Sequence, residues 1–87
     1  IPHCWGSGIA LAAALQLCAT ISPVPHTAFP HAPENAPMIE YDKNFNPLRD
    51  ELLTQGFKVE DGFVKIPDGP GLGIEIKDSI LEKYLVV

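Results

Sequence analysis

An almost uninterrupted apolar run, residues 9–18, constrains the fold of this chain more than any other feature. The run predicts a helix that is apolar on nearly every face, with Gln16 and Thr20 as the residues available to water, and such a helix needs neighbours all round. All eleven carboxylates and all six Lys and Arg residues lie from Glu34 onward, in a remainder too small to surround the helix. We therefore expect the chain to be the C-terminal part of a larger protein.

Composition and spacing argue against three classes of protein. The apolar stretch closes at Thr20 and Pro23 follows, whereas a transmembrane helix needs about 20 apolar residues. A secretory leader begins with basic residues, and here there is no Lys or Arg before Lys43. The net charge is −5, with no basic stripe to neutralise phosphates. We expect a cytoplasmic protein that has no membrane partner and no nucleic-acid partner.

The two cysteines fit a reducing compartment. A helix from Gly8 places Cys18 about 15 Å from its start, beyond the roughly 7 Å that a disulfide spans between Cα atoms. A bond between Cys4 and Cys18 is therefore not expected. Cys18 is interpreted as a small core residue. Cys4 is either a nucleophile or, in the interpretation we favour, part of a pocket lining.

The rest of the chain predicts a mixed fold of short elements. Residues 22–37 are proline-rich and predict a loop, in which His26 and His31 match no zinc-binding spacing and are expected at the surface. Asp61-Gly62 lies between two alternating runs and predicts a β-hairpin. The other expected elements are a strand at 38–41, a helix at 48–53 begun by Asn46-Pro47, a structural turn at 67–73, a strand at 74–76 and a final helix through Leu85, opened by a Ser79-x-x-Glu82 capping box.

The candidate chemistry lies just before the apolar helix. His3 is expected at the end of a strand, beside Trp5 and above a helix N-terminus, where an imidazole is placed to transfer a proton. Glu40 ends another expected strand and is its natural companion, so the pair could act as base and acid on one substrate. Gly6-x-Gly8 lacks the third glycine of a dinucleotide motif. The helix start either binds an anionic group of a ligand or is a tight turn with no ligand.

Several segments, in this order, resemble the C-terminal end of the mandelate racemase and muconate lactonizing enzyme group of the enolase superfamily. They are residues 2–15, 38–42, 46–48, 61–62 and 67–73. The Pro-Asp-Gly-Pro-Gly-Leu-Gly turn at 67–73 is the most distinctive of them. The resemblance implies an α/β fold in which residues 1–55 form the end of a modified (β/α) TIM-type barrel. Residues 56–87 would then supply a hairpin, a turn and a C-terminal helix that return to complete an α+β capping domain.

The same resemblance implies a site. His3 matches the histidine that ends the seventh barrel strand and acts as base or acid, with an aspartate partner outside this chain. Glu40 resembles the glutamate that ends the eighth strand and hydrogen-bonds the substrate carboxylate or the enediolate formed from it. Trp5 would face the substrate. Magnesium is implied as cofactor, held by three acidic residues that are also outside this chain.

The expected function is a fragment of a magnesium-dependent enzyme that removes the α-proton of a small carboxylate substrate. An acid-sugar dehydratase, a lyase, is preferred. A racemase or epimerase of a hydroxy- or amino-acid derivative is the alternative, because a β-hydroxyl permits elimination and its absence leaves only inversion. The expected partners are the remainder of the same enzyme and further copies in a homo-oligomer. The 87 residues alone are expected to be inactive.

A second hypothesis, from another class, is a non-catalytic segment that serves structure or interaction. It would dock onto a partner through its apolar helix, residues 9–18. The two hypotheses differ in their prediction for His3→Asn in the full-length protein: turnover should fall steeply on the first and stay unchanged on the second.

Overall fold

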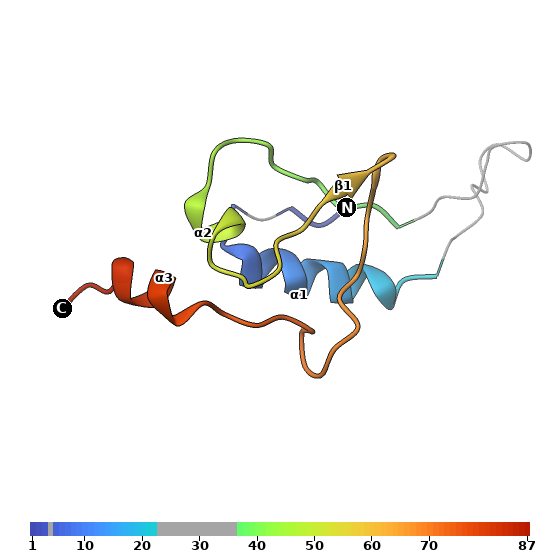
Figure 1. Ribbon diagram of the computed structural model, residues 1–87. Helices are drawn as coiled ribbons and strands as arrows, with labels where there is room; N and C mark the ends of the chain where they lie inside the picture. Colours follow the sequence, from blue (N-terminus) through green and yellow to red (C-terminus); the bar gives the residue numbers. More distant parts are fainter. Residues whose placement is uncertain (4, 23–36) are drawn as a thin grey trace, which may run out of the picture.

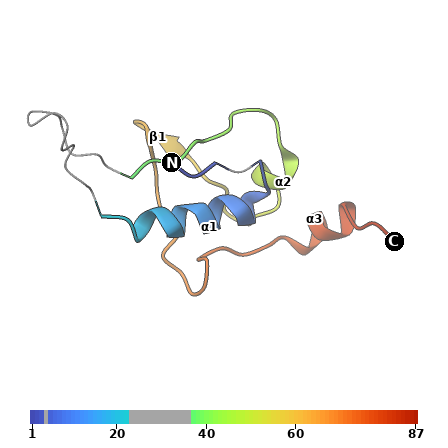
Figure 2. The same ribbon diagram turned by 180° about the vertical axis from the view of Figure 1, so that it is seen from behind.

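The computed structural model describes residues 1–3, 5–22 and 37–87 (Figure 1). The elements in chain order are helix α1 (Gly8–Ala19), helix α2 (Pro47–Asp50), strands β1 (Val59–Glu60) and β2 (Phe63–Val64), and helix α3 (Asp78–Lys83). The two strands form an antiparallel hairpin with Glu60 opposite Phe63. Helix α1 lies centrally, with α2 and the hairpin on one side of it, and α3 ends a C-terminal segment that leads away (Figures 1 and 2). The predicted mixture of α and β elements is confirmed.

Helix α1 begins where the sequence predicts. The Ser7 side chain accepts a hydrogen bond from the backbone N–H of Ile9 at 3.3 Å and caps the first turn. The buried residues of the helix recur every three or four positions on one face: Gly8, Ala12, Leu15 and Cys18. Cys18 is a free, buried thiol, so its interpretation as a core residue is confirmed. Cys4 lies outside the described residues.

The core is formed between α1 and the residues that follow α2. Its buried apolar members are Ala12, Leu15, Cys18, Leu52 and Leu53, of which Leu53 keeps only 1% of its surface exposed. On the other face of α1, Ile9 and Leu17 remain 36% and 56% exposed. The described part of the chain therefore does not surround its apolar helix, as composition predicts.

The start of α1 and the region of α2 touch at Gly8. A Cβ atom at this position would lie 2.9 Å from Cδ1 of Leu53 and 3.0 Å from the carbonyl oxygen of Arg49. These separations are shorter than van der Waals contact, so only glycine lets the helix start approach so closely. The contact brings the segment before α1 next to the segment before α2.

The side chain of Gln16 binds the glycine-rich turn. Its Nε2 donates hydrogen bonds to the carbonyl oxygens of Pro67 at 2.7 Å and Leu72 at 3.4 Å. Within the turn, Gly71 and Gly73 have φ values of +63° and +73°, which side chains rarely tolerate. The interpretation of residues 67–73 as a structural turn agrees with this geometry. Gln16, expected to be available to water, is half-buried and its amide nitrogen is bound to the turn.

Helix α2 is shorter than expected because tertiary pairing takes over the end of the predicted helix. The helix ends at Asp50, and the expected helical residues up to Leu53 instead leave it. The backbone carbonyl of Leu52 accepts from the N–H of Lys77 at 2.8 Å, and the N–H of Thr54 donates to Glu75 at 2.9 Å. Of the strand expected at 74–76, only Ile76 forms a bridge, opposite Leu53.

The last helix begins one residue before the predicted cap. Its first residue is Asp78, so Ser79 lies inside the first turn and the predicted capping box is wrong. Lys77 occupies the N-cap position and makes no side-chain cap hydrogen bond. Lys77 is held there by its backbone bond to Leu52, so a long-range contact sets the start of the helix.

Arg49 secures the loop that follows Glu40. It is only 9% exposed, and its Nε and Nη2 donate to the two carboxylate oxygens of Asp50 at 2.7 and 2.9 Å. Nη2 also donates to the carbonyl of Asn44 at 2.8 Å, and Nη1 donates to the carbonyl of Asp42. Since a guanidinium presents several donors in a rigid plane, one side chain fixes the path of the loop at several points.

Gly8→Ala should destabilise the protein. Alanine is favoured over glycine in a helix by about 0.5–1 kcal/mol, but overpacking a tight contact costs about 1–3 kcal/mol. Overpacking should win, because a backbone carbonyl and a fully buried leucine cannot move aside. Gly56→Ala is the control, since its Cβ would meet nothing closer than 3.7 Å. Urea unfolding of the purified protein measures both variants. Equal stability of Gly8→Ala and the parent would contradict the contact.

Acid should weaken the Arg49–Asp50 pair. Hydrogen bonds from Arg49 hold the pKa of Asp50 below its ordinary value of 3.8. The pair therefore contributes stability in full above that value, and the contribution is lost as the pH falls through the lowered pKa. The Asp50 side chain is 43% exposed, so we expect Asp50→Asn to cost less than about 1 kcal/mol. Urea unfolding from neutral pH to about pH 3 should show the difference shrinking; a constant difference would contradict this assignment.

Candidate functional site

His3 lies in the extended segment before α1, with its side chain 48% exposed. The Trp5 ring meets it edge-on, with ring centroids 6.1 Å apart and planes at 69°. Trp5 itself is 78% exposed. The sequence predicts strands at His3 and at 38–41, but neither forms among the described residues. Among the residues that the structure describes, the backbone bond between the two segments runs from Glu40 N–H to the carbonyl of Pro2 at 3.1 Å.

The structure brings His3 and Glu40 together from positions far apart in the chain. Nε2 of His3 lies 3.9 Å from Oε2 of Glu40, whose side chain is 63% exposed. This separation is too long for a hydrogen bond, but one ligand atom lying off the line between the two groups could contact both at hydrogen-bond distance. Both side chains are open to solvent, and neither is used in a hydrogen bond among the described residues.

A small hollow of about 280 Å³ lies beside the site. It is lined by Trp5 and by residues of the loop after Glu40, which are Asp42, Asn44, Phe45 and Asn46. Phe45 is 84% exposed. Sequence reasoning missed Phe45, although a lone aromatic in an otherwise polar loop was visible. It assigned Asn46 as a helix cap, which the structure confirms through the bond from Arg49 N–H at 3.2 Å.

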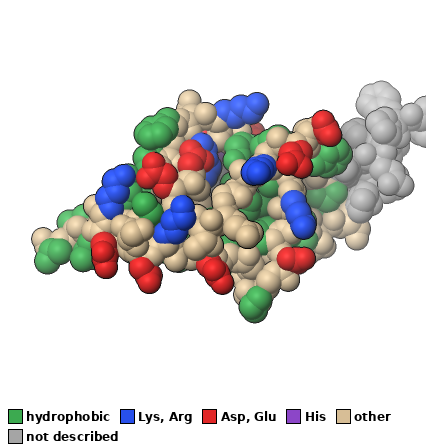
Figure 3. All heavy atoms as spheres, in the orientation of Figure 1, with side chains coloured by type: hydrophobic (Ala, Val, Ile, Leu, Met, Phe, Trp, Pro, Cys, Tyr) green, Lys and Arg blue, Asp and Glu red, His purple; other side chains and the backbone are tan. Residues whose placement is uncertain are grey.

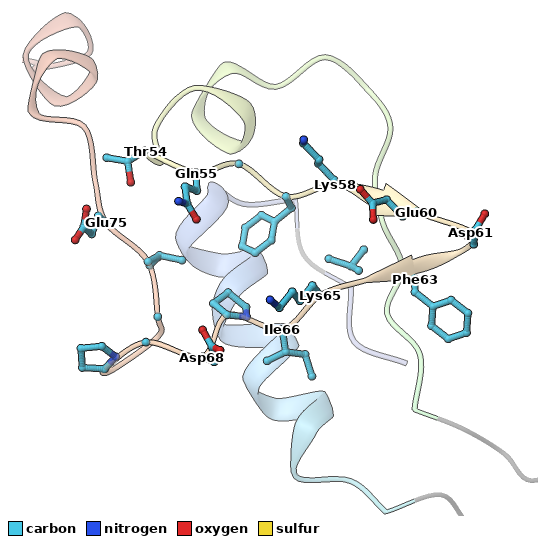
Figure 4. A pocket seen from close by; sticks show the side chains of 18 residues that line it. Thr54, Gln55, Lys58, Glu60, Asp61, Phe63, Lys65, Ile66, Asp68 and Glu75 are labelled. Atoms are coloured by element: carbon cyan, nitrogen blue, oxygen red, sulfur yellow. The ribbon is translucent and has the colours of Figure 1, made fainter.

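The larger hollow of the molecule lies elsewhere. It measures about 1100 Å³ and is lined by residues between 54 and 75, which come from the hairpin, from the segment before it and from the turn after it (Figure 4). Its polar lining combines Lys58 and Lys65 with carboxylates such as Glu60 and Glu75, and contains no histidine, cysteine or serine. His3, Trp5 and Glu40 do not line it. Although the hollow is larger, its lining lacks the imidazole that makes the His3–Glu40 site a candidate for proton transfer.

No metal centre is formed by the described residues. Within residues 1–3, 5–22 and 37–87, no three His, Cys, Asp or Glu side chains gather closely enough to hold an ion. His26 and His31 lie outside this range. The residues present therefore do not fit a magnesium site by themselves.

On the face shown in Figure 3, basic and acidic side chains are interspersed.

Among the described helices, none has the length and apolar character needed to cross a membrane.

The sequence is similar to known proteins over nearly its whole length. Residues 1–80 match the family described as enolase C-terminal domain-like. Over 84 residues, 97% of the chain, it is 42% identical to D-galactarolactone cycloisomerase of Agrobacterium fabrum and 32% identical to arabinonate dehydratase of Saccharolobus solfataricus. The match covers 21% and 19% of these relatives, so the chain spans about a fifth of their length. The order of motifs thus predicted the relationship correctly: the chain belongs to the enolase C-terminal domain-like family of the enolase superfamily.

Proposed function

We propose that the full-length protein carrying this chain is an acid-sugar dehydratase, a lyase in which His3 moves a proton at the substrate. The observation that carries the proposal is the pairing of His3 and Glu40, 3.9 Å apart and both open to solvent. The proposal is supported by the similarity to arabinonate dehydratase. We take the substrate class to be small sugar acids.

The residues of this chain would act on the substrate in two ways. Neutral His3 would accept the proton from the carbon next to the substrate carboxylate, or the protonated ring would donate to the β-hydroxyl that leaves as water. Trp5 would contact the carbon skeleton of the substrate with its ring and could donate a hydrogen bond through its indole N–H. In both cases His3 must reach the reacting atom directly, which its exposure permits.

Glu40 would hold the substrate through a hydrogen bond. An ionised carboxylate only accepts hydrogen bonds, so Glu40 must carry a proton to donate to the substrate carboxylate or to the enediolate. A donor aimed at the oxygen where charge develops stabilises the transition state more than the ground state. This is the role that we propose for Glu40.

Magnesium would supply positive charge to the substrate carboxylate when it is bound by residues outside this chain. The residues of this chain do not fit a metal site by themselves, so no step above depends on it. We keep the barrel assignment of residues 1–55 and the capping assignment of 56–87 as part of the proposal, together with a homo-oligomer. The barrel assignment and the homo-oligomer are supported by the exposed face of α1, where Ile9 and Leu17 are not covered by the described part of the chain. A cytoplasmic location also remains a prediction from the sequence.

An isomerase is the second candidate. The similarity to D-galactarolactone cycloisomerase favours reaction of a sugar-acid lactone, and a racemase or epimerase also remains open. All of these share removal of a proton next to a carboxyl group. Incubation of the full-length protein with sugar acids and lactones in deuterated water, followed by NMR, separates them: loss of water marks the dehydratase, and deuterium incorporation without loss of water marks an isomerase.

The non-catalytic hypothesis is favoured by the same open face of α1. It requires that the protein has no turnover depending on His3. The next experiment therefore tests it against the enzymatic proposal.

His3→Asn should lower kcat about 10²–10⁴-fold, because the amide cannot take up a proton in the transition state. The assay uses the full-length protein with its best sugar acid. Lys65→Ala, in the larger hollow, is the control and should retain activity. Unchanged turnover of His3→Asn would refute the enzymatic role, and loss of activity in Lys65→Ala alone would move the site to the larger hollow.

Glu40→Gln should retain more activity than Glu40→Ala. The amide keeps a hydrogen-bond donor in nearly the same shape, so kcat should remain within about tenfold, whereas loss of the donor should cost about 10²–10³-fold. Steady-state kinetics of the two variants make the comparison. If Gln is as damaging as Ala, the donor role of Glu40 is wrong and its negative charge is what matters.

A further inference from the structure

The two segments that carry the candidate site are joined at both of their ends. At one end, the backbone N–H of Glu40 donates to the carbonyl of Pro2 at 3.1 Å. At the other, Nδ2 of Asn46 donates to the carbonyl of Gly6 at 3.1 Å. His3 and Trp5 lie between Pro2 and Gly6 on the first segment. The two bonds therefore hold the first segment to the second on either side of His3 and Trp5.

Of these two bonds, the one to Gly6 is made by a side chain, that of Asn46. Its Nδ2 reaches Gly6, while its Oδ1 accepts from the backbone N–H of Arg49 at 3.2 Å and caps α2. The side chain is thus fixed at both of its polar atoms. A helix cap needs only the acceptor. The donor half of the amide is what ties the segment of His3 to the helix that follows the segment of Glu40.

The loop between Glu40 and Asn46 has little freedom to compensate for loss of this tie. Arg49 bonds the carbonyls of Asp42 and Asn44, so the loop is anchored to α2 along its length. Among the described residues, the segment of His3 is held at Pro2 and Gly6, by the entry into α1 at Ser7 and by the packing at Gly8. Without the bond to Gly6, no described bond between Pro2 and the helix start would hold the chain from Trp5 to Gly6 against movement relative to Glu40.

We propose that Asn46 is a positioning residue, which sets the approach of His3 and Trp5 to Glu40 by binding the Gly6 carbonyl. The role rests on the proposed function of His3. The effect should fall on kcat more than on KM, because small errors in the placement of a reacting group raise the barrier of the chemical step. We expect kcat to drop about 10–100-fold when the bond is lost.

Three substitutions separate positioning from capping. Asn46→Asp and Asn46→Ser both keep a side-chain acceptor that caps α2. Neither can reproduce the bond to Gly6, because an ionised carboxylate has no donor and the Ser side chain is too short to cap α2 and reach Gly6 at once. Asn46→Ala loses the cap as well. On the positioning account, all three lose kcat while KM changes little, and Asn46→Ala loses the most stability in urea. Because Asp adds a charge and Ser does not, a shared loss cannot be due to charge.

The outcomes distinguish this proposal from the one it rests on. If Asn46→Asp and Asn46→Ser fold with parental stability and keep parental kcat while His3→Asn does not, Asn46 only caps a helix and the positioning role is refuted. If His3→Asn itself keeps full activity, the proposed function fails first. Amide hydrogen exchange gives a second readout. The Glu40 amide, which donates to Pro2, should exchange faster in the Asp and Ser variants, while the amides of α2 stay protected; unchanged exchange at Glu40 would also overturn the proposal.

Discussion

The close approach of α1 to α2 at Gly8 is the contact on which the rest of the structure depends. A helix start that lies 3.0 Å, measured from an added Cβ, from a backbone carbonyl leaves no room for any side chain. Because the segment carrying His3 enters α1 directly and the segment carrying Glu40 leads into α2, this contact brings the two segments side by side, where the bonds at Pro2 and Gly6 join them. The small core of Leu15, Leu52 and Leu53 then holds the contact in place. Packing at Gly8 is therefore a condition for the site as well as for stability.

The elements that neighbouring residues determine, such as the hairpin, could be predicted from the sequence. The hairpin followed from Asp61-Gly62, whose φ values of +51° and +79° are those of a tight turn that suits this pair of residues. The ends of α2 and α3 were not predictable in the same way, because the pairing of Leu52 with Lys77 spans distant positions in the chain. Gln16 shows the same limit. The sequence predicted a side chain available to water, and its amide nitrogen binds a turn more than fifty positions away.

The sequence predicted that the candidate residues lie near one another, and it predicted less of what holds them there. His3, Trp5 and Glu40 do come together, although the strands expected to carry them do not form in the described part of the chain. What spacing could not reveal is how the two segments are held. Asn46 followed the rule for a helix cap, and nothing in a cap predicts which distant carbonyl its free amide nitrogen will bind. Likewise, nothing in the sequence distinguished Arg49 from the other charged residues, and only the fold shows that it anchors the neighbouring loop.

The most direct test is a crystal structure of the full-length protein with a sugar acid or an unreactive analogue bound. The quantity to measure is the distance from Nε2 of His3 to the carbon beside the ligand carboxylate. The account predicts about 3–3.5 Å, the separation of groups poised to react, with an oxygen of Glu40 in hydrogen-bond contact with the same ligand. A ligand bound away from both residues, or an imidazole turned from it and buried under other side chains, would contradict the account.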